Sequence, residues 1–219
     1  MGGEEGLPDA RPRHRVWVDA FEIGVTPVTT AEYAVFLDAT GHAPPPFWDD
    51  PLFHDPAQPV VGASWFDAVA YCDWLIRATG ISFRLPTEAE WERAARGGLE
   101  DQPYPWGDQD PNRLLRVILG TERLPADRPT RVKEFLPNPF GLHDLSGLVH
   151  EWCYDWYDEE YYRVSPERNP TGPARGERRV SRGGAWRHQN PWSRVAHRSS
   201  LPPHHHYSDY SFRVARAAP

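Results

Sequence analysis

Apolar side chains recur with a helical period at three places in the first hundred residues, and each place carries start and stop signals. The first predicted helix begins after Thr29, whose hydroxyl can cap it together with Glu32, and it ends near Gly41. The same signals recur in two more helices, from Ser64 and Asp67 to Gly80 and from Thr87 and Glu90 to Gly97.

Alternating apolar and polar positions predict β-strands at 16–24 and 149–157. Residues 180–186 and 212–215 read as the closing strands of an antiparallel sheet. From residue 99 onward loops dominate, in keeping with 24 prolines and 17 glycines. No repeat and no shift in composition divides the chain, so we expect one α+β domain at 14–219, preceded by a tail at 1–13.

Charge and hydropathy exclude several classes of function. The net charge of -7 disfavours binding to nucleic acid, because phosphates would be repelled. No run of 18 apolar residues predicts a transmembrane helix, and no signal peptide is visible, so we expect a cytoplasmic protein, with surface display left open. The high proline content and the preference for arginine over lysine are compatible with a thermophilic source.

Two cysteines, Cys72 and Cys153, lie far apart in the sequence. They could form one disulfide, but two buried free thiols are the favoured interpretation for a chain without an export signal. No CxxC pair or cysteine–histidine spacing typical of a zinc site occurs.

Residues 182–213 crowd polar and aromatic side chains between two strand patterns and contain no cysteine. We expect this segment to contact a ligand through His188, Asn190, Trp192, His204, His205, His206, Tyr207, Asp209 and Tyr210. Tyrosine provides a large contact area at low entropic cost, which favours Tyr207 and Tyr210 as anchors. The run His204–His206 could bind a metal, but adjacent strand residues point to opposite faces, so a solvent-facing contact surface is favoured.

Several motifs, in one order along the chain, resemble the formylglycine-generating, sulfatase-modifying family. They include FRLPTEAEWERAAR at 83–96, GLVHEW at 147–152 and RGGAW at 182–186, with further matches at 21–33, 59–74, 105–107, 138–142 and 212–213. The resemblance covers about residues 14–215. It implies a C-type-lectin-like fold, in which short helices pack against a twisted antiparallel sheet among long loops.

The enzymes of that family oxidise a substrate cysteine with copper held by two active-site cysteines, because copper(I) needs soft thiolates. The resemblance places the first cysteine at His188 and the second near Ser193, so the copper-binding pair is missing here. Related enzymes make carbon–sulfur bonds at iron bound by an HxxxHxE pattern, which this chain also lacks. A metal-dependent oxidase of either kind remains the alternative function.

The same resemblance extends to variable proteins of diversity-generating retroelements, in which a C-terminal segment is rewritten by adenine-directed mutagenesis. That segment begins near Arg-Gly-Gly-Ser/Ala-Trp and ends near Gly-Phe-Arg; here the chain has RGGAW at 182–186 and SFR at 211–213. Residues 204–211 are all reachable from randomised Asn codons. We therefore favour a non-catalytic protein that binds a variable ligand, expected to be another protein, through a diversified surface.

The family also binds a structural calcium near the motif that here reads GLVHEW. The resemblance implies that Gly147, Val149 and Glu151 could hold such an ion through two backbone oxygens and a carboxylate. The alternative is an ion pair between Glu151 and one of the many arginines, and the sequence leaves both open. No cofactor is otherwise required.

Overall fold

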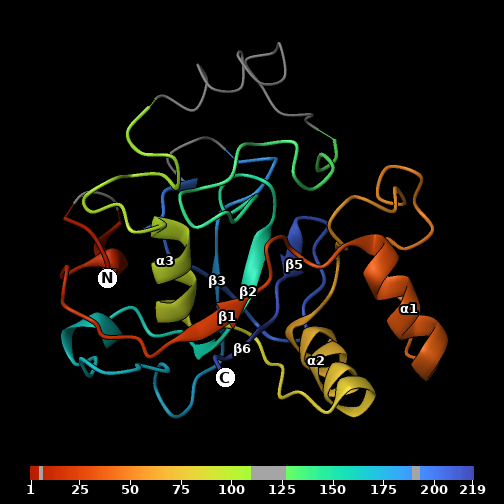
Figure 1. Ribbon diagram of the computed structural model, residues 1–219, viewed down its shortest axis with the longest axis horizontal. Helices are drawn as coiled ribbons and strands as arrows, with labels where there is room; N and C mark the ends of the chain where they lie inside the picture. The colour runs from red at the N-terminus through yellow and green to blue at the C-terminus, as the bar shows by residue number, and fades with distance from the viewer. Residues whose placement is uncertain (5–6, 110–126, 189–192) are drawn as a thin grey trace.

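The three predicted helices all form, and each begins and ends at the predicted residues. The computed structural model describes all residues except 5–6, 110–126 and 189–192 (Figure 1). Helices α1 (Thr30–Thr40), α2 (Trp65–Thr79) and α3 (Glu88–Arg96) each carry a complete capping box at the amino end and a left-handed glycine at the carboxyl end. The α+β class is confirmed.

Four strands form the central sheet, in the order β4-β3-β2-β5. They are β2 (His150–Trp156), β3 (Arg179–Arg182), β4 (Ser199–Leu201) and β5 (Tyr210–Phe212). Strand β3 is antiparallel to β2, as predicted, but β5 is parallel to it, with His150 opposite Tyr210. The predicted strand at 212–215 is therefore divided: Phe212 ends the parallel β5, whereas Ala215 pairs antiparallel with Ile23. Strand β5 is parallel because the long return after β3 brings the chain back along β2 in the same direction.

A second sheet joins the two ends of the domain. Strand β1 (Phe21–Ile23) pairs antiparallel with β6 (Ala215–Ala217). The predicted strand at 16–24 is thus reduced to its last part. Upstream of β1, Trp17 is 63% exposed and pairs with Arg168 in an isolated bridge instead of a continuous strand.

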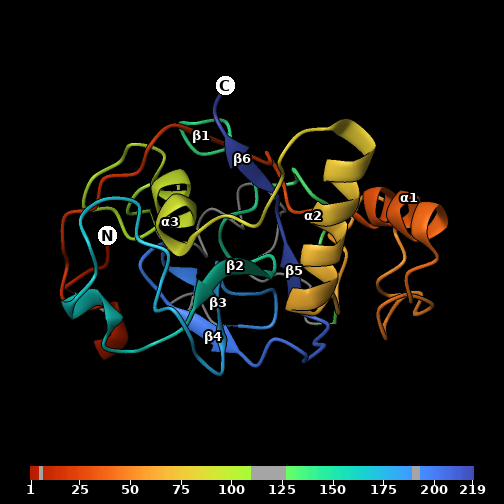
Figure 2. The same ribbon diagram turned by 90° about the horizontal axis from the view of Figure 1, so that it is seen from below.

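The helices cover opposite faces of the central sheet (Figures 1 and 2). On one face, α1 and α2 enclose Trp152, Tyr210 and Phe212 in a core of aromatic side chains. On the other, Trp91 of α3 packs in the cluster that contains Cys153. Because side chains alternate along a strand, His150 lies on the same face of β2 as Trp152, and Glu151 lies on the same face as Cys153.

The amino-terminal segment, predicted as a tail, lies against the body of the domain. It forms a short 3-10 helix, η1 (Pro8–Ala10), in which Ala10 is buried. The amide of Gly2 donates to Glu92 at 2.9 Å, and Tyr157 donates to Asp9 at 2.8 Å. A second short 3-10 helix, η2 (Tyr161–Arg163), follows β2.

Three buried arginines of the C-terminal segment each pair with a buried glutamate of the scaffold: Arg182 with Glu92, Arg198 with Glu88, and Arg213 with Glu151. None of these arginine side chains is exposed. Burial raises the pKa of Glu92, but the charges of Arg182 and Arg96 outweigh it and hold the pKa below its usual value. The segment is therefore fastened to α3 and β2 at three points.

The Gly183–Gly184 pair turns the chain sharply after β3. Both residues have positive φ, at 94° and 68°, a conformation that favours glycine. A Cβ at Gly183 would lie 3.3 Å from both Trp91 and the Val149 carbonyl oxygen. Close packing and backbone shape thus both require glycine at this corner.

Both cysteines are buried free thiols, which confirms the favoured interpretation. Burial raises the pKa of Cys72 to about 12 and that of Cys153 well above its usual value. Among the described residues, no helix is long and apolar enough to cross a membrane.

A histidine-rich surface above a buried histidine and aspartate

The predicted ligand-binding residues divide into exposed and buried groups. His204, His206 and Tyr207 are exposed, His205 is partly buried, and the side chain of His188 is 34% exposed. Asp209 and Tyr210, in contrast, are only 5% and 6% exposed. The predicted residues Asn190 and Trp192 lie outside the described residues.

Tyr210, predicted as a ligand anchor, is buried and does not present its ring to solvent. Its ring packs 4.9 Å from Trp152, and its hydroxyl accepts a hydrogen bond from Ser181 at 3.2 Å. Tyr210 opens β5 on the face covered by α2, so its side chain belongs to the core. Asp209 is also buried, directly before that strand.

Contacts between aromatic rings connect the exposed residues of this segment through the buried His150 and Tyr210. His188 contacts His150 at 4.9 Å between centroids, and His150 stacks on Tyr210 at 4.8 Å. Tyr210 contacts Tyr207 at 6.2 Å, and the series continues through His205 to His204. We call His188, His204, His205, His206 and Tyr207 the histidine-rich surface; His150, Asp209 and Tyr210 form its buried floor.

Backbone hydrogen bonds fix the loop that carries most of this surface. The amide of Gly62 donates to the carbonyl oxygens of Tyr207 and Tyr210, both at 3.1 Å. The Trp65 amide donates to Pro203 at 3.0 Å, and the His206 Nδ1 lies 2.7 Å from the Gly62 oxygen. His206 therefore helps to hold the loop, whereas His204 and Tyr207 present their rings to solvent.

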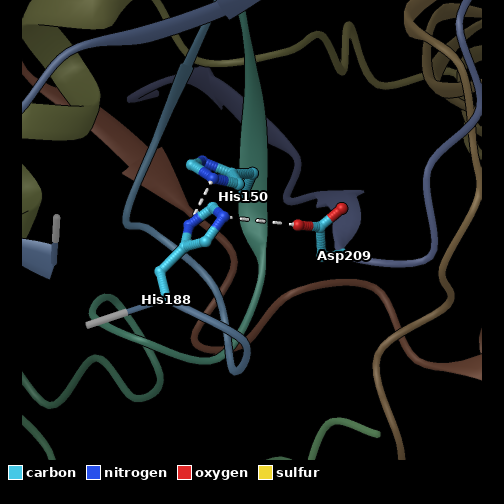
Figure 3. Close-up of side chains that lie close together, drawn as sticks. All are labelled: His150, His188 and Asp209. Carbon is cyan, nitrogen blue, oxygen red and sulfur yellow. Dashed lines mark hydrogen bonds and ion pairs between the residues drawn. The ribbon is translucent and has the colours of Figure 1, made fainter. Parts of the chain in front are cut away.

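Three side chains converge at one end of this floor (Figure 3). His150 Nε2 lies 3.1 Å from His188 Nδ1, and His188 Nε2 lies 3.8 Å from an Asp209 carboxylate oxygen. In the described part of the chain, they are the one group of three or more histidine, cysteine, aspartate or glutamate side chains that converges in this way, with one donor atom from each within 4.8 Å of the others.

Sequence reasoning missed His150. It reads as an ordinary position in a buried strand, and its partner His188 lies 38 residues away. The signal that could have found it is a histidine at a core-facing strand position, where an apolar residue is expected.

Burial sets the protonation of both histidines. It lowers the pKa of His150 well below its usual value, and positive charge at His188, His197 and Arg187 lowers that pKa further. Burial also lowers the pKa of His188, although Asp209 opposes the shift and Arg187 reinforces it. Neutral imidazoles can accept hydrogen bonds or bind metal ions through a free ring nitrogen.

The residues predicted to hold calcium, Gly147, Val149 and Glu151, do not belong to the group formed by His150, His188 and Asp209. The Glu151 carboxylate accepts hydrogen bonds from Arg213 at 2.6 Å and from Trp91 Nε1 at 2.6 Å. The alternative that the sequence left open, an ion pair with arginine, is therefore present. Calcium at Gly147, Val149 and Glu151 stays a prediction, and such an ion would have to compete with Arg213 for the carboxylate.

Comparison with known proteins identifies a family that spans the chain. The sulfatase-modifying factor enzyme 1-like domain family matches residues 1–218. The formylglycine-generating enzyme of Streptomyces coelicolor is 34% identical over 281 residues, which cover 99% of this chain and 88% of that enzyme. The serine/threonine-protein kinase pkn1 of Chlamydia pneumoniae is 35% identical over 234 residues, covering 98% of this chain but only 36% of the kinase. The chain thus spans about a third of that kinase.

Solved structures confirm the expected C-type-lectin-like, formylglycine-generating-enzyme-like fold. PvdO from Pseudomonas aeruginosa matches with a TM-score of 0.84 and 27% identity, covering 100% of this chain and 90% of that chain. Treponema denticola variable protein 1 matches with a TM-score of 0.78 and 27% identity, covering 93% of this chain and 86% of that chain.

Proposed function

The chain belongs to the sulfatase-modifying factor enzyme 1-like family, and on that premise we propose that it binds a protein ligand through a diversified histidine-rich surface. The scaffold supplies rigidity, and the exposed side chains supply specificity. The similarity to a variable protein of the same fold supports this proposal.

The observation that carries the proposal is the position of the three buried Arg–Glu pairs. Arg182, Arg198 and Arg213 hold the segment from inside the domain, away from the exposed rings. Buried pairs of this kind are strongly destabilised when one partner is removed, so their positions must stay fixed. Exposed positions between them change stability little when substituted, which is what a diversified surface requires.

The fixed loop backbone also favours binding. Contacts from Gly62 and Trp65 hold residues 203–210 in one conformation before any partner arrives. A preordered loop avoids part of the entropy that binding otherwise costs. The exposed Tyr207 ring, at 46% exposure, provides an anchor of the kind that dominates many interfaces.

Because Asp209 and Tyr210 are buried, the proposed binding surface contains fewer residues than the sequence predicted. Both are reachable from randomised Asn codons, but a substitution at either would change the floor rather than the exposed face. We therefore place the diversified positions at His204, His205 and Tyr207.

A metal-dependent oxidase is the second candidate, and two observations favour it. The Streptomyces coelicolor relative is a formylglycine-generating enzyme, and the match covers 99% of this chain and 88% of that enzyme. The convergence of His150, His188 and Asp209 also offers a metal-ligand set. Against copper–thiolate chemistry stand His188 at the family's first cysteine position and two cysteines whose raised pKa values keep them protonated.

Genomic DNA provides the first test. A nearby reverse-transcriptase gene, with a near-copy of the coding segment for residues 182–213 that differs at adenines, is the expected finding. Absence of the copy, together with turnover of a cysteine peptide by copper- or iron-loaded protein, would overturn the proposal in favour of an oxidase.

A binding experiment provides the second test. Immobilised protein is expected to retain a ligand from its native source, and the His204→Ala/Tyr207→Ala variant is expected to lose it. Phe140→Ala is the matched control, because Phe140 is a similarly exposed aromatic residue, at 49%, that packs beside Arg93 of α3. Equal retention by both variants would contradict the assignment of the surface.

A further inference from the structure

We propose that His150, His188 and Asp209 bind a divalent transition-metal ion of the zinc or ferrous-iron class. Two imidazole nitrogens with one carboxylate oxygen are a ligand set that both ions accept, with positions left for water or another ligand. The proposal does not depend on the binding function, since a metal could order the floor of the surface in either a binder or an enzyme.

The first argument is that burying the His150 imidazole is energetically unfavourable. Its side chain is 3% exposed, and its Nδ1 has no hydrogen-bond partner among the described residues. A buried polar atom without a partner destabilises a fold unless another role retains it. An apolar residue would fill this strand position without that cost, so the imidazole needs a chemical reason to be there, and its other nitrogen, Nε2, which faces His188, can supply one.

The second argument is geometric. His150 Nε2 and His188 Nδ1 are 3.1 Å apart, close to the separation of about 3.3 Å that two ligands have on a tetrahedral ion. A hydrogen bond at this distance requires a proton between the two nitrogens, and a metal ion would replace that proton.

Binding all three groups to one ion requires a small movement of the side chains. One donor atom from each residue lies within 4.8 Å of the others, whereas bonds of about 2.1 Å allow donors to be at most about 4.2 Å apart. Dashed lines join His188 to both other side chains in Figure 3, and His188 is the most exposed of the three. It can therefore turn one nitrogen toward a shared ion.

Backbone contacts hold the two buried ligands together. The His150 amide donates to the Asp209 carbonyl oxygen at 2.8 Å, beside the parallel register that places His150 opposite Tyr210. Rigid strands position metal ligands better than loops do.

One cation competes for the same carboxylate. Arg187 Nε lies 3.4 Å from the Asp209 oxygen that faces His188, and the guanidinium also donates to Ser208 Oγ. Arg187 is 39% exposed, so it can withdraw into solvent when a divalent ion takes over the neutralisation of Asp209.

The test is metal titration of the chelator-stripped full chain. Zn²⁺, and Fe²⁺ without oxygen, are titrated calorimetrically, and Co²⁺ is used as an absorption probe of coordination geometry. One equivalent is expected to bind, and His188→Ala and Asp209→Asn are each expected to weaken binding about 100-fold or more. His150→Gln, whose fold is checked by circular dichroism, is expected to do the same.

The matched control is His204→Ala/His205→Ala, which removes surface histidines outside the proposed site. It is expected to bind one equivalent with unchanged affinity. If this variant loses the metal, if His188→Ala keeps it, or if the wild-type chain binds no stoichiometric ion, the proposal is overturned. Because the readout is metal affinity, its failure is distinct from a failure of ligand capture.

Discussion

Glu151 and Arg213 form an ion pair at 2.6 Å in which neither side chain is exposed to solvent. Glu151 lies on β2 and Arg213 directly after β5, so the pair connects the two parallel strands from the face opposite His150. The arginine also donates to the carbonyl oxygens of Gly24 and His143, at 2.8 and 3.0 Å. One side chain thus links the amino-terminal strand region, the central sheet and the C-terminal segment.

Replacing one partner of this pair should be severely destabilising. Glu151→Gln leaves the Arg213 charge buried without compensation, and we expect it to lower the free energy of unfolding by about 3–5 kcal/mol. Urea unfolding measures the change. The control is Glu22→Gln, which breaks an exposed pair with Arg216 and should cost about 1 kcal/mol or less. Similar losses in both variants would contradict the role assigned to burial.

The two tyrosines of the C-terminal segment should respond differently to truncation. Tyr210 is 6% exposed and packs on Trp152 and His150, so Tyr210→Ala should lower the free energy of unfolding by about 3–5 kcal/mol. Tyr207 is 46% exposed, and Tyr207→Ala should change stability by about 0.5 kcal/mol or less. Thermal unfolding of the two variants compares them directly. A large loss in Tyr207→Ala would mean that the loop depends on that ring.

Asp144 should make stability depend on pH. Burial raises its pKa to about 6, although the Lys133 amide and the Arg213 charge oppose the shift. Because the folded pKa lies above the unfolded value, its contribution is fully present below about pH 4 and is lost as pH rises through 6.

Asp144→Asn should remove this dependence. Relative to the variant, the wild-type protein should lose on the order of 3 kcal/mol between pH 4 and pH 7. Urea unfolding at both pH values measures the difference, with Asp49→Asn, at an exposed position, as the control. A constant difference between wild type and Asp144→Asn would show that the carboxyl group is already ionised at pH 4.

The native cysteines should be unreactive. Cys72 and Cys153 are 2% and 0% exposed, and burial keeps both as thiols at pH 8. We expect iodoacetamide to leave the folded protein unmodified and to label both residues in urea, as measured by mass spectrometry. His204→Cys places a thiol at an exposed position and should add one rapid label to the folded protein. Rapid labelling of wild type would indicate that the core opens.

Local chemistry made the helices predictable from the sequence. In each one, the hydroxyl and carboxylate of the capping box lie three residues apart, so the signal is complete within a single turn. The buried side chains Ala68, Tyr71 and Cys72 of α2 lie at helical spacing, in keeping with the apolar period that predicted this helix.

The floor of the candidate site was not predictable by such means. Whether Tyr210 faces the core depends on its parallel pairing with β2, and that pairing joins positions 60 residues apart in the chain. His150 and His188 meet only because β3 and the glycine corner bring them together. The sequence revealed the composition of the segment, but the division into exposed and buried side chains required the fold.

The three arginine anchors also divide the C-terminal segment into separate parts. Residues 183–197 and 199–212 are two spans, each closed at both ends by a charged side chain held inside the domain. A change of length in one span need not displace the other, because the shared end at Arg198 is fixed by Glu88. Insertions and deletions during evolution can therefore reshape one span between its own anchors, provided that the contacts from Arg187 and His188 to Asp209 are kept.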